Sequence, residues 1–240
     1  MSEMISVNYT LMNQGYPPFN YHPWGQDQLI DDVRWKYGLP PAGNANYAWI
    51  QHMIHHLAPN GKIGLVLANG ALSTQSSGEG EIRKRIIEDD LIEGIIAMPT
   101  QLFYSVTIPV TLWFITKGKK QKGKTLFIDA RKMGHMVDRK HRDFDEEDIQ
   151  KLADTFEAFQ KGTLGDVKGF CAVATLQDIE KQDYILTPGR YVGIEEVEDD
   201  GEPFEEKMAR LTKELGELFA KSHDLEKEIR RKLGAIGYEI

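Results

Sequence analysis

The chain has 240 residues, of which 41% are hydrophobic and 28% are charged, as is ordinary for a globular protein with one domain and an appendage. Its net charge of −8 argues against a protein that grips nucleic acid alone by neutralising phosphates, although it permits a DNA substrate held by a partner subunit. The lone cysteine, Cys171, excludes an internal disulfide framework, suits a cytoplasmic location and is expected to be a small buried side chain. The sequence begins without the basic and apolar regions of a signal peptide and has no run of ~20 apolar residues, so we expect no membrane span.

Residues 13–25, NQGYPPFNYHPWG, form the segment most suggestive of chemistry. Two prolines hold the backbone rigid, so that a carbonyl is aimed before a ligand binds, and the ring of Phe19 can stack on a planar base. A second aromatic pair, Phe103 and Tyr104, follows an expected strand and would form a second wall for an extruded adenine. A plain Pro-Pro-Phe turn is the alternative.

Three short apolar runs, residues 62–70, 91–99 and 110–117, are bounded by Gly, Pro or polar residues and predict buried strands. Apolar residues at helical spacing predict helices over 45–59 and 80–90. This alternation predicts an α/β fold with parallel strands. The second and third runs lie too close for a crossover helix, so we expect them to be antiparallel or separated by a loop.

Five lysines lie within residues 117–124, ahead of another expected strand. Their simplest interpretation is a solvated loop, and the alternative is that Lys119, Lys120 and Lys122 contact the phosphates of a nucleic acid. Residues 145–162 begin with acidic side chains and end in Lys-Gly, which predicts a helix with a complemented dipole and a glycine terminator.

Near the C-terminus, apolar side chains recur at alternating steps of four and three residues, interrupted only at Ser222. These side chains are Phe204, Met208, Leu211, Leu215, Leu218, Leu225 and Ile229. Such heptad spacing predicts an amphipathic helix of coiled-coil type, and Pro203 stands where that helix can begin. The helix either packs on its own domain or pairs with the helix of a partner.

Three histidines, His52, His55 and His56, share one expected helix at a spacing that suggests zinc binding. No cysteine lies nearby and no glutamate follows His52, as it would in a zinc-protease helix, so we expect no metal site. The sequence also lacks a glycine-rich turn after a first strand, which is the usual cradle of a nucleotide-like cofactor.

Six segments stand in order along the chain: PPFNYHPWG, DDVRWKYGLPPAGNANYAWIQHMIHHLAPNGKIGLVLANG, SSGEGEIRKRIIEDDLIEGIIAMPTQLFYS, LFIDARKMGHMVDR, LTPGRYVG and DDGEPFEEKMARLTKEL. With the residues between them, they resemble the methylase (modification) subunit of type I restriction-modification systems, an adenine-specific DNA methyltransferase. The resemblance covers the chain from about residue 17 to its end. It implies a partial Rossmann-like methyltransferase sheet that lacks its N-terminal strands, followed by a C-terminal helical or coiled-coil tail.

By this resemblance, three residues form the base-holding part of an Asn-Pro-Pro-Phe motif: Pro17, Pro18 and Phe19. The Pro17 carbonyl would accept a hydrogen bond from the adenine amino group, and Phe19 would stack on the base. Tyr16 stands where the family has asparagine, so one of two acceptors for the amino group is missing. Phe103 and Tyr104 match the family's second base-facing motif. The family's methyl donor is S-adenosylmethionine, whose main binding motif is absent from this sequence.

The resemblance implies four parts: an unmatched segment (1–16), the back half of the catalytic domain (17–142), a helix with a connecting segment (143–202) and an assembly helix (203–240). In the family, such C-terminal helices assemble with the DNA-specificity subunit, in a complex that acts on double-stranded DNA and includes a restriction subunit. Our hypothesis is a C-terminal part of a methylase that transfers methyl to the N6 of adenine within that complex and is inactive as an isolated chain. The alternatives are a non-catalytic module that binds the specificity subunit, and a truncated gene product.

Overall fold

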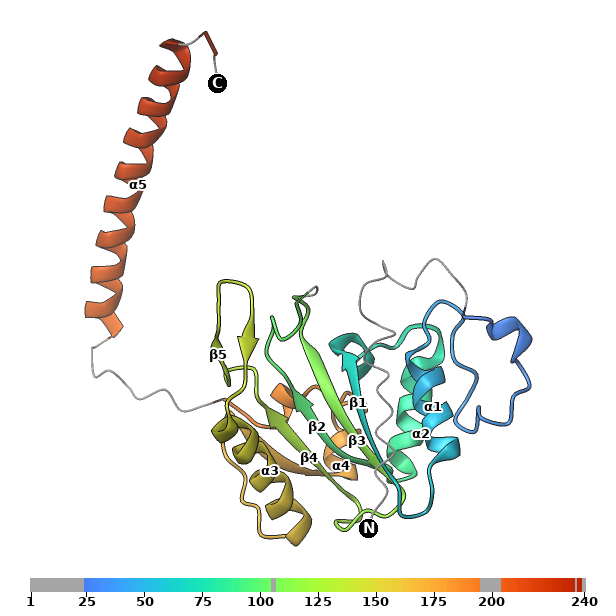
Figure 1. Cartoon of the computed structure of the whole chain (residues 1–240). Helices are drawn as coiled ribbons and strands as arrows, with labels where there is room; N and C mark the ends of the chain where they lie inside the picture. The colour runs from blue at the N-terminus through green and yellow to red at the C-terminus, as the bar shows by residue number, and fades with distance from the viewer. Residues whose placement is uncertain (1–23, 105–106, 195–203, 236, 239–240) are drawn as a thin grey trace. The chain divides into compact units, whose positions relative to one another are not determined.

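A five-stranded mixed sheet organises the larger of two units into which the chain divides, residues 1–196 and 197–240 (Figure 1). The computed structural model describes residues 24–104, 107–194, 204–235 and 237–238. The strands follow the order β1-β3-β2-β4-β7 across the sheet. Their bounds are β1 (Lys62–Ala68), β2 (Ile92–Ala97), β3 (Val110–Thr116), β4 (Lys124–Asp129) and β7 (Cys171–Thr175).

The strand directions are mixed rather than uniformly parallel. β2 and β4 are parallel neighbours, whereas β3 runs antiparallel to both β1 and β2, and β7 runs antiparallel to β4. The antiparallel arrangement expected for the segments 91–99 and 110–117 is thereby confirmed, since their connection is too short for a crossover. Strands β1, β2 and β4 all point the same way, so their carboxyl ends meet at one side of the sheet.

Two sides of the sheet matter for function. We call the side where β1, β2 and β4 end the carboxyl edge, formed by residues 69–78, 98–104 and 130–143. We call the side where these strands begin the amino edge, formed by residues 89–91 and 117–123.

Helices cover both faces of the sheet (Figure 1). On one face, the core contains side chains from α1 (Asn46–His56), α2 (Glu79–Glu88) and α4 (Leu176–Glu180). On the other face, Phe159 of α3 (Glu146–Lys161) packs with residues of β2 and β4. The helices predicted over 45–59, 80–90 and 145–162 are thus confirmed with slightly shorter bounds.

The ends of α3 show how local chemistry sets a helix boundary. The Asp145 side chain accepts a hydrogen bond from the backbone N–H of Asp148 at 2.8 Å, which satisfies a donor that the first turn leaves free. At the other end Gly162 adopts φ 74°, a left-handed conformation that glycine takes without strain.

Strand β7 was not anticipated from the sequence. It comes from the segment 143–202, which the resemblance had set aside as a helix and a connection, yet it pairs with β4 along residues 171–175. Its first residue, Cys171, is buried, as predicted for a small apolar side chain. The central sheet therefore extends beyond the part of the chain that was expected to form it.

The prediction of buried strands is confirmed for all residues of β2, but only for alternate residues of β1. Every residue of β2 is buried, whereas β1 alternates between buried and exposed positions. The difference arises because successive side chains of β1 point to opposite faces: Ile63, Leu65 and Leu67 pack in the core, and the side chains between them are exposed or half-buried.

Short elements complete the larger unit. A two-stranded hairpin, β5 (His135–Met136) and β6 (Arg142–Asp143), follows β4. The described residues of this unit also form the 3₁₀ turns η3 (Gln26–Gln28), η4 (Asn69–Leu72), η5 (Ser76–Gly78) and η6 (Pro188–Arg190).

In the second unit the structure describes the helix α5 (Phe204–Ala235), which confirms the amphipathic helix expected there. None of its described side chains is buried. Within the part of the chain that the structure describes, no helix combines the length and apolarity that crossing a membrane requires.

Candidate functional site

The carboxyl edge is the expected position of a ligand site, because α/β sheets bind their ligands beyond the carboxyl ends of their parallel strands. It contains the segment after β2, with Phe103 and Tyr104, and the β5–β6 hairpin after β4. The predicted base-holding residues Tyr16, Pro17, Pro18 and Phe19 lie outside the described residues, so their roles stay predictions.

The two neighbouring aromatic residues after β2 differ in their surroundings. Phe103 is partly buried and packs against the core on the α3 face, whereas the Tyr104 side chain is 90% exposed. The Tyr104 ring lies 4.3 Å from the ring of His141, measured between centroids, in a tilted contact. Tyr104 therefore presents one exposed aromatic platform at the carboxyl edge, and Phe103 supports the loop from below.

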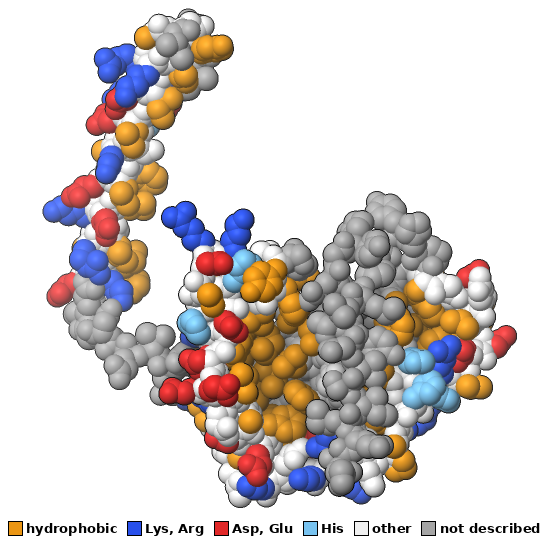
Figure 2. All heavy atoms as spheres, viewed as in Figure 1, with side chains coloured by type: hydrophobic (Ala, Val, Ile, Leu, Met, Phe, Trp, Pro, Cys, Tyr) orange, Lys and Arg blue, Asp and Glu red, His pale blue; other side chains and the backbone are white. Residues whose placement is uncertain are grey.

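The β5–β6 hairpin supplies His141 and turns tightly around Asp138. One Asp138 carboxylate oxygen accepts hydrogen bonds from the backbone N–H groups of Lys140 and His141 at 2.6 and 2.9 Å, and the other lies 2.6 Å from His141 Nδ1. The His141 side chain and then the backbone donors hold the pKa of Asp138 at about 2, so the carboxylate stays charged at the turn. Figure 2 shows Lys and Arg side chains at this hairpin tip, next to His and hydrophobic side chains.

At the base of the hairpin, an ion pair closes the end of β4. The Asp129 carboxylate accepts from Arg131 Nε at 2.8 Å and from its terminal nitrogen at 2.5 Å. Burial acts to raise the pKa of Asp129, but the hydrogen bonds from Arg131 outweigh it, and the net pKa lies below its usual value. The pair neutralises both side chains locally where the chain leaves β4.

The lysine-rich loop lies at the amino edge, on the opposite side of the sheet from Tyr104. Lys119 is not solvated: its side chain is only 3% exposed, and its Nζ lies 2.5 Å from Asp90 Oδ1. Burial lowers the pKa of Lys119, although Asp90 opposes that effect. The solvated-loop interpretation therefore does not hold for Lys119, and the alternative of a phosphate contact stays a prediction that its buried, paired charge disfavours.

The other lysines of this loop differ from Lys119. Lys120 and Lys122 are exposed, so the solvated-loop interpretation is confirmed for these two residues. Their contact with DNA stays a prediction, and the structure does not bring them near Tyr104, because they occupy the amino edge.

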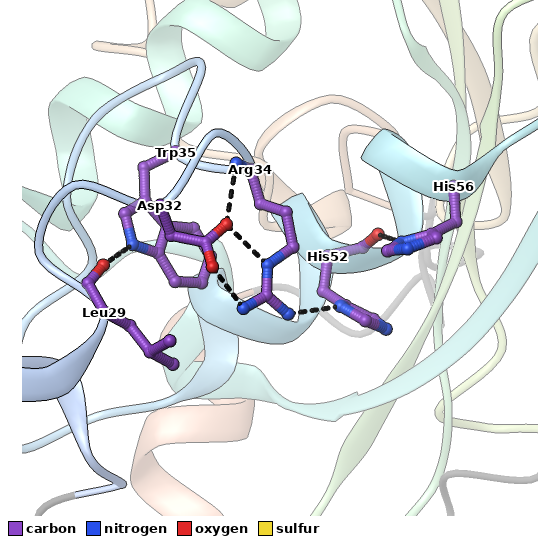
Figure 3. Close-up of polar contacts among 6 residues, drawn as sticks. All are labelled: Leu29, Asp32, Arg34, Trp35, His52 and His56. Carbon is purple, nitrogen blue, oxygen red and sulfur yellow. Dashed lines mark hydrogen bonds and ion pairs between the residues drawn. The ribbon is translucent and has the colours of Figure 1, made fainter.

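Of the three histidines of α1, His52 contacts an arginine, and the His56 ring lies 2.8 Å from the His52 carbonyl oxygen (Figure 3). Arg34 Nε and a terminal nitrogen donate to the Asp32 carboxylate at 2.7 and 2.6 Å, and the other terminal nitrogen lies 2.8 Å from His52 Nδ1. Burial, followed by the nearby His56 and Arg34, lowers the pKa of His52. No cluster of three His, Cys, Asp or Glu side chains able to hold a metal occurs among the residues described. Arg34 thus links the segment before α1 to the helix.

The apolar stripe of α5 is exposed within its own unit. The exposed side chains include Leu211, Leu215, Leu218, Leu225 and Ile229. Ion pairs one turn apart, such as Glu226 with Arg230 at 2.9 Å, lie on the polar surface of the helix. A stripe of this length on a charged helix is the type of surface that pairs with another helix, and the coiled-coil arrangement itself stays a prediction.

Sequence comparisons place these features in a family. The family profile described as N-6 DNA Methylase matches residues 7–200. The chain is 56% identical over 224 residues to the type I restriction enzyme HindI methylase subunit of Haemophilus influenzae, a match that covers 93% of this chain and 51% of that protein. It is 46% identical over 245 residues to the MjaIX methylase subunit of Methanocaldococcus jannaschii, with 98% of this chain and 43% of that protein covered. The chain thus spans about half the length of these relatives.

Solved structures agree with the sequence comparisons. The type I restriction-modification methyltransferase subunit from Streptococcus thermophilus superposes with a TM-score of 0.65 at 27% identity, over 72% of this chain and 36% of that one. The type I restriction enzyme EcoKI M protein superposes with a TM-score of 0.53 over 82% of this chain and 48% of that one, and at 18% identity it shows a shared fold alone. The expected α/β methyltransferase fold is confirmed.

Proposed function

The chain belongs to the N-6 DNA methylase family, and from that premise we propose that it is part of a type I methylase subunit that transfers methyl from S-adenosylmethionine to the N6 of adenine in DNA. We further propose that it works in a cytoplasmic complex with a DNA-specificity subunit and a restriction subunit.

The observation that carries this proposal is the family match over residues 7–200, which spans both the Pro-Pro-Phe segment and the Phe103–Tyr104 loop. The exposed Tyr104 ring at the carboxyl edge supports it, because an extruded base needs an accessible aromatic face on which to stack.

In the proposed reaction, this chain holds the base rather than the methyl donor. The Pro17 carbonyl accepts one amino hydrogen of adenine, Phe19 stacks on the ring, and Tyr104 lines the opposite approach. Tyr16 replaces the amide acceptor of the family motif, so the amino group keeps one hydrogen bond fewer as positive charge develops on it. We expect this replacement to slow the transfer.

S-adenosylmethionine supplies the methyl group when bound. The sequence contains no glycine-rich turn after a first strand to cradle it, and no described residue takes that role. We therefore propose that another part of the methylase holds the donor and that the isolated 240-residue chain is inactive.

Methyl transfer from labelled S-adenosylmethionine to DNA tests both proposals. We expect none with the chain alone, and transfer once it is supplemented with the remaining part of a related methylase subunit and a specificity subunit. In that assembly Tyr16→Asn should raise the rate about tenfold, since one restored hydrogen bond contributes about 1–1.5 kcal/mol. Transfer by the isolated chain would contradict its inactivity, and a silent assembly would contradict the methylase proposal.

A second candidate function is supported by the exposed stripe of α5: a non-catalytic module that binds the specificity subunit. We expect the chain to co-purify with that subunit and to lose binding when Leu215→Asp and Leu225→Asp place charges in the stripe. Ala209→Asp with Ala220→Asp is the matched control, because it adds the same charge outside the heptad positions. Binding that survives the stripe changes would exclude α5 as the contact.

A further inference from the structure

We propose that the hairpin of residues 131–143 contacts DNA phosphates beside the base that Tyr104 faces, a role that the sequence had suggested for the lysine loop instead. The inference rests on the proposed action of the protein on DNA. It is carried by the charge of the hairpin, by the free side chains at its tip and by its attachment to the Tyr104 loop.

The hairpin is locally basic in an acidic chain. Residues 131–143 contain five Lys or Arg residues and two Asp residues; of the five, Arg131 is paired with Asp129 just outside this range, and the other four leave an excess of positive charge in a chain whose net charge is −8. A basic patch on an otherwise acidic surface directs a polyanion to one place, because the rest of the surface repels it.

The charges at the tip are free to act on a ligand. Arg139 and Lys140 are exposed, and the part of the chain that the structure describes offers neither side chain an ion-pair or hydrogen-bond partner. Among the described residues, the neighbouring Asp138 forms no ion pair with either side chain, because its carboxylate oxygens accept hydrogen bonds from the backbone of Lys140 and His141 and contact the His141 ring. Asp138 instead shapes the turn that points both cations outward, as an Asp at the start of a turn commonly does.

The hairpin is fixed to the Tyr104 loop. The backbone N–H of Arg142 donates to the Gln101 carbonyl at 2.9 Å, and the Arg142 side chain donates to the carbonyls of Met133 and Gly134 at 3.0 and 2.9 Å. Gly134 adopts φ 74°, and a Cβ there would lie 2.6 Å from the carbonyl oxygen of Asp143, so the two arms meet closely only with glycine. The tip is thereby held at a set place relative to Tyr104.

The combination of groups favours a nucleic acid over an acidic protein segment. A nucleotide offers a planar base and a charged phosphate within one unit, and the carboxyl edge offers an exposed ring in contact with His141 beside two unpaired cations. An acidic peptide would use the cations and leave the Tyr104 ring without a function.

The test uses the assembled methylase, namely this chain with the remaining part of the subunit and a specificity subunit. Binding to a fluorescein-labelled duplex of random sequence is measured across a salt series. We expect Arg139→Gln with Lys140→Gln to weaken binding about tenfold and to lower the slope of log affinity against log salt by about 1–2, roughly one for each lost phosphate contact. Lys120→Gln with Lys122→Gln removes the same charge at the amino edge and should leave both values unchanged.

The inference would be overturned if neither double variant changed DNA binding, or if both double variants changed it equally. It would also be overturned if the hairpin variant lost binding to the restriction subunit while its DNA affinity stayed intact, since the hairpin would then contact a protein partner. Methyl transfer by the unaltered assembly is measured in the same samples. Hairpin-dependent binding without methyl transfer would refute the proposed function alone, and methyl transfer with hairpin-independent binding would refute the hairpin contact alone.

Discussion

The two edges of the sheet carry similar numbers of basic residues and use them in different ways. At the amino edge, Lys119 is buried against Asp90, so its charge holds the loop 117–123 to the start of β2. At the carboxyl edge, Arg139 and Lys140 are exposed without partners among the described residues, so their charges remain available. The number of basic residues in a segment therefore does not show how many of their charges are available to a ligand. That depends on whether a carboxylate lies close enough to pair with each of them.

The ion pairs at the two edges are also built in opposite ways. In the amino-edge pair the cation is buried and Asp90 is 37% exposed, whereas in the carboxyl-edge pair Asp129 is 10% exposed and Arg131 is 57% exposed. Removing Asp90 leaves the buried cation Lys119 unpaired, whereas removing Arg131 leaves the buried anion Asp129 unpaired. Stability measurements can therefore separate the two edges.

The largest effect is expected at the amino edge. Asp90→Ala leaves the Lys119 ammonium buried without a counter-charge and removes the acceptor of the Gly123 N–H, which lies 2.9 Å from Asp90 Oδ2. We expect a loss of about 2 kcal/mol in the free energy of unfolding, less than for a fully buried pair because water reaches Asp90. Urea denaturation at neutral pH measures it.

Two variants control this comparison. Lys120→Ala, at an exposed position of the same loop, should change stability by less than about 0.5 kcal/mol. Lys119→Met should cost less than Asp90→Ala, because an apolar side chain of similar length removes the buried charge itself. If the Asp90→Ala variant has the same urea midpoint as the unaltered protein, the Asp90–Lys119 pair does not stabilise the loop 117–123.

At the carboxyl edge we expect loss of activity without loss of stability. Tyr104→Ala should reduce methyl transfer by the assembled enzyme about tenfold, since stacking on one base contributes about 1–3 kcal/mol. Its urea midpoint should not move, because the side chain is 90% exposed. Tyr104→Phe keeps the ring and should retain activity, and an active Tyr104→Ala enzyme would remove this residue from the base-binding site.

The smallest effect concerns acid stability. The pKa of Asp129 is lowered in the folded protein, so its contribution is fully present above the unfolded pKa of about 3.9 and is lost as the pH falls through the folded value. Arg131→Gln should therefore cost under about 1 kcal/mol at pH 7, because Arg131 is mostly exposed, and the difference should vanish in strong acid. Thermal unfolding at both pH values measures it, and a difference that grows in acid would reverse the assigned sign.

Much of the fold could be predicted because its signals are local. The helices 46–56, 79–88 and 146–161 follow from apolar spacing within a few turns, and the end of α3 follows from one glycine. The antiparallel pairing of β2 with β3 follows from the length of their connection alone. Of the candidate site, the sequence predicted Phe103 and Tyr104 as a pair and did not distinguish them, because the exposure of each ring depends on what lies beneath the loop.

By itself, the sequence determined the family, the alternation of strands and helices and the amphipathic character of α5, since each depends on residues close together in the chain. Only the tertiary structure decided that β7 joins the sheet, that Lys119 pairs with a carboxylate 29 residues away, and that the basic hairpin lies beside Tyr104. The reason is that charge pairing and burial are set by neighbours in space. The order of strands in the sheet determines which residues become neighbours, and that order cannot be predicted from any local pattern of residues.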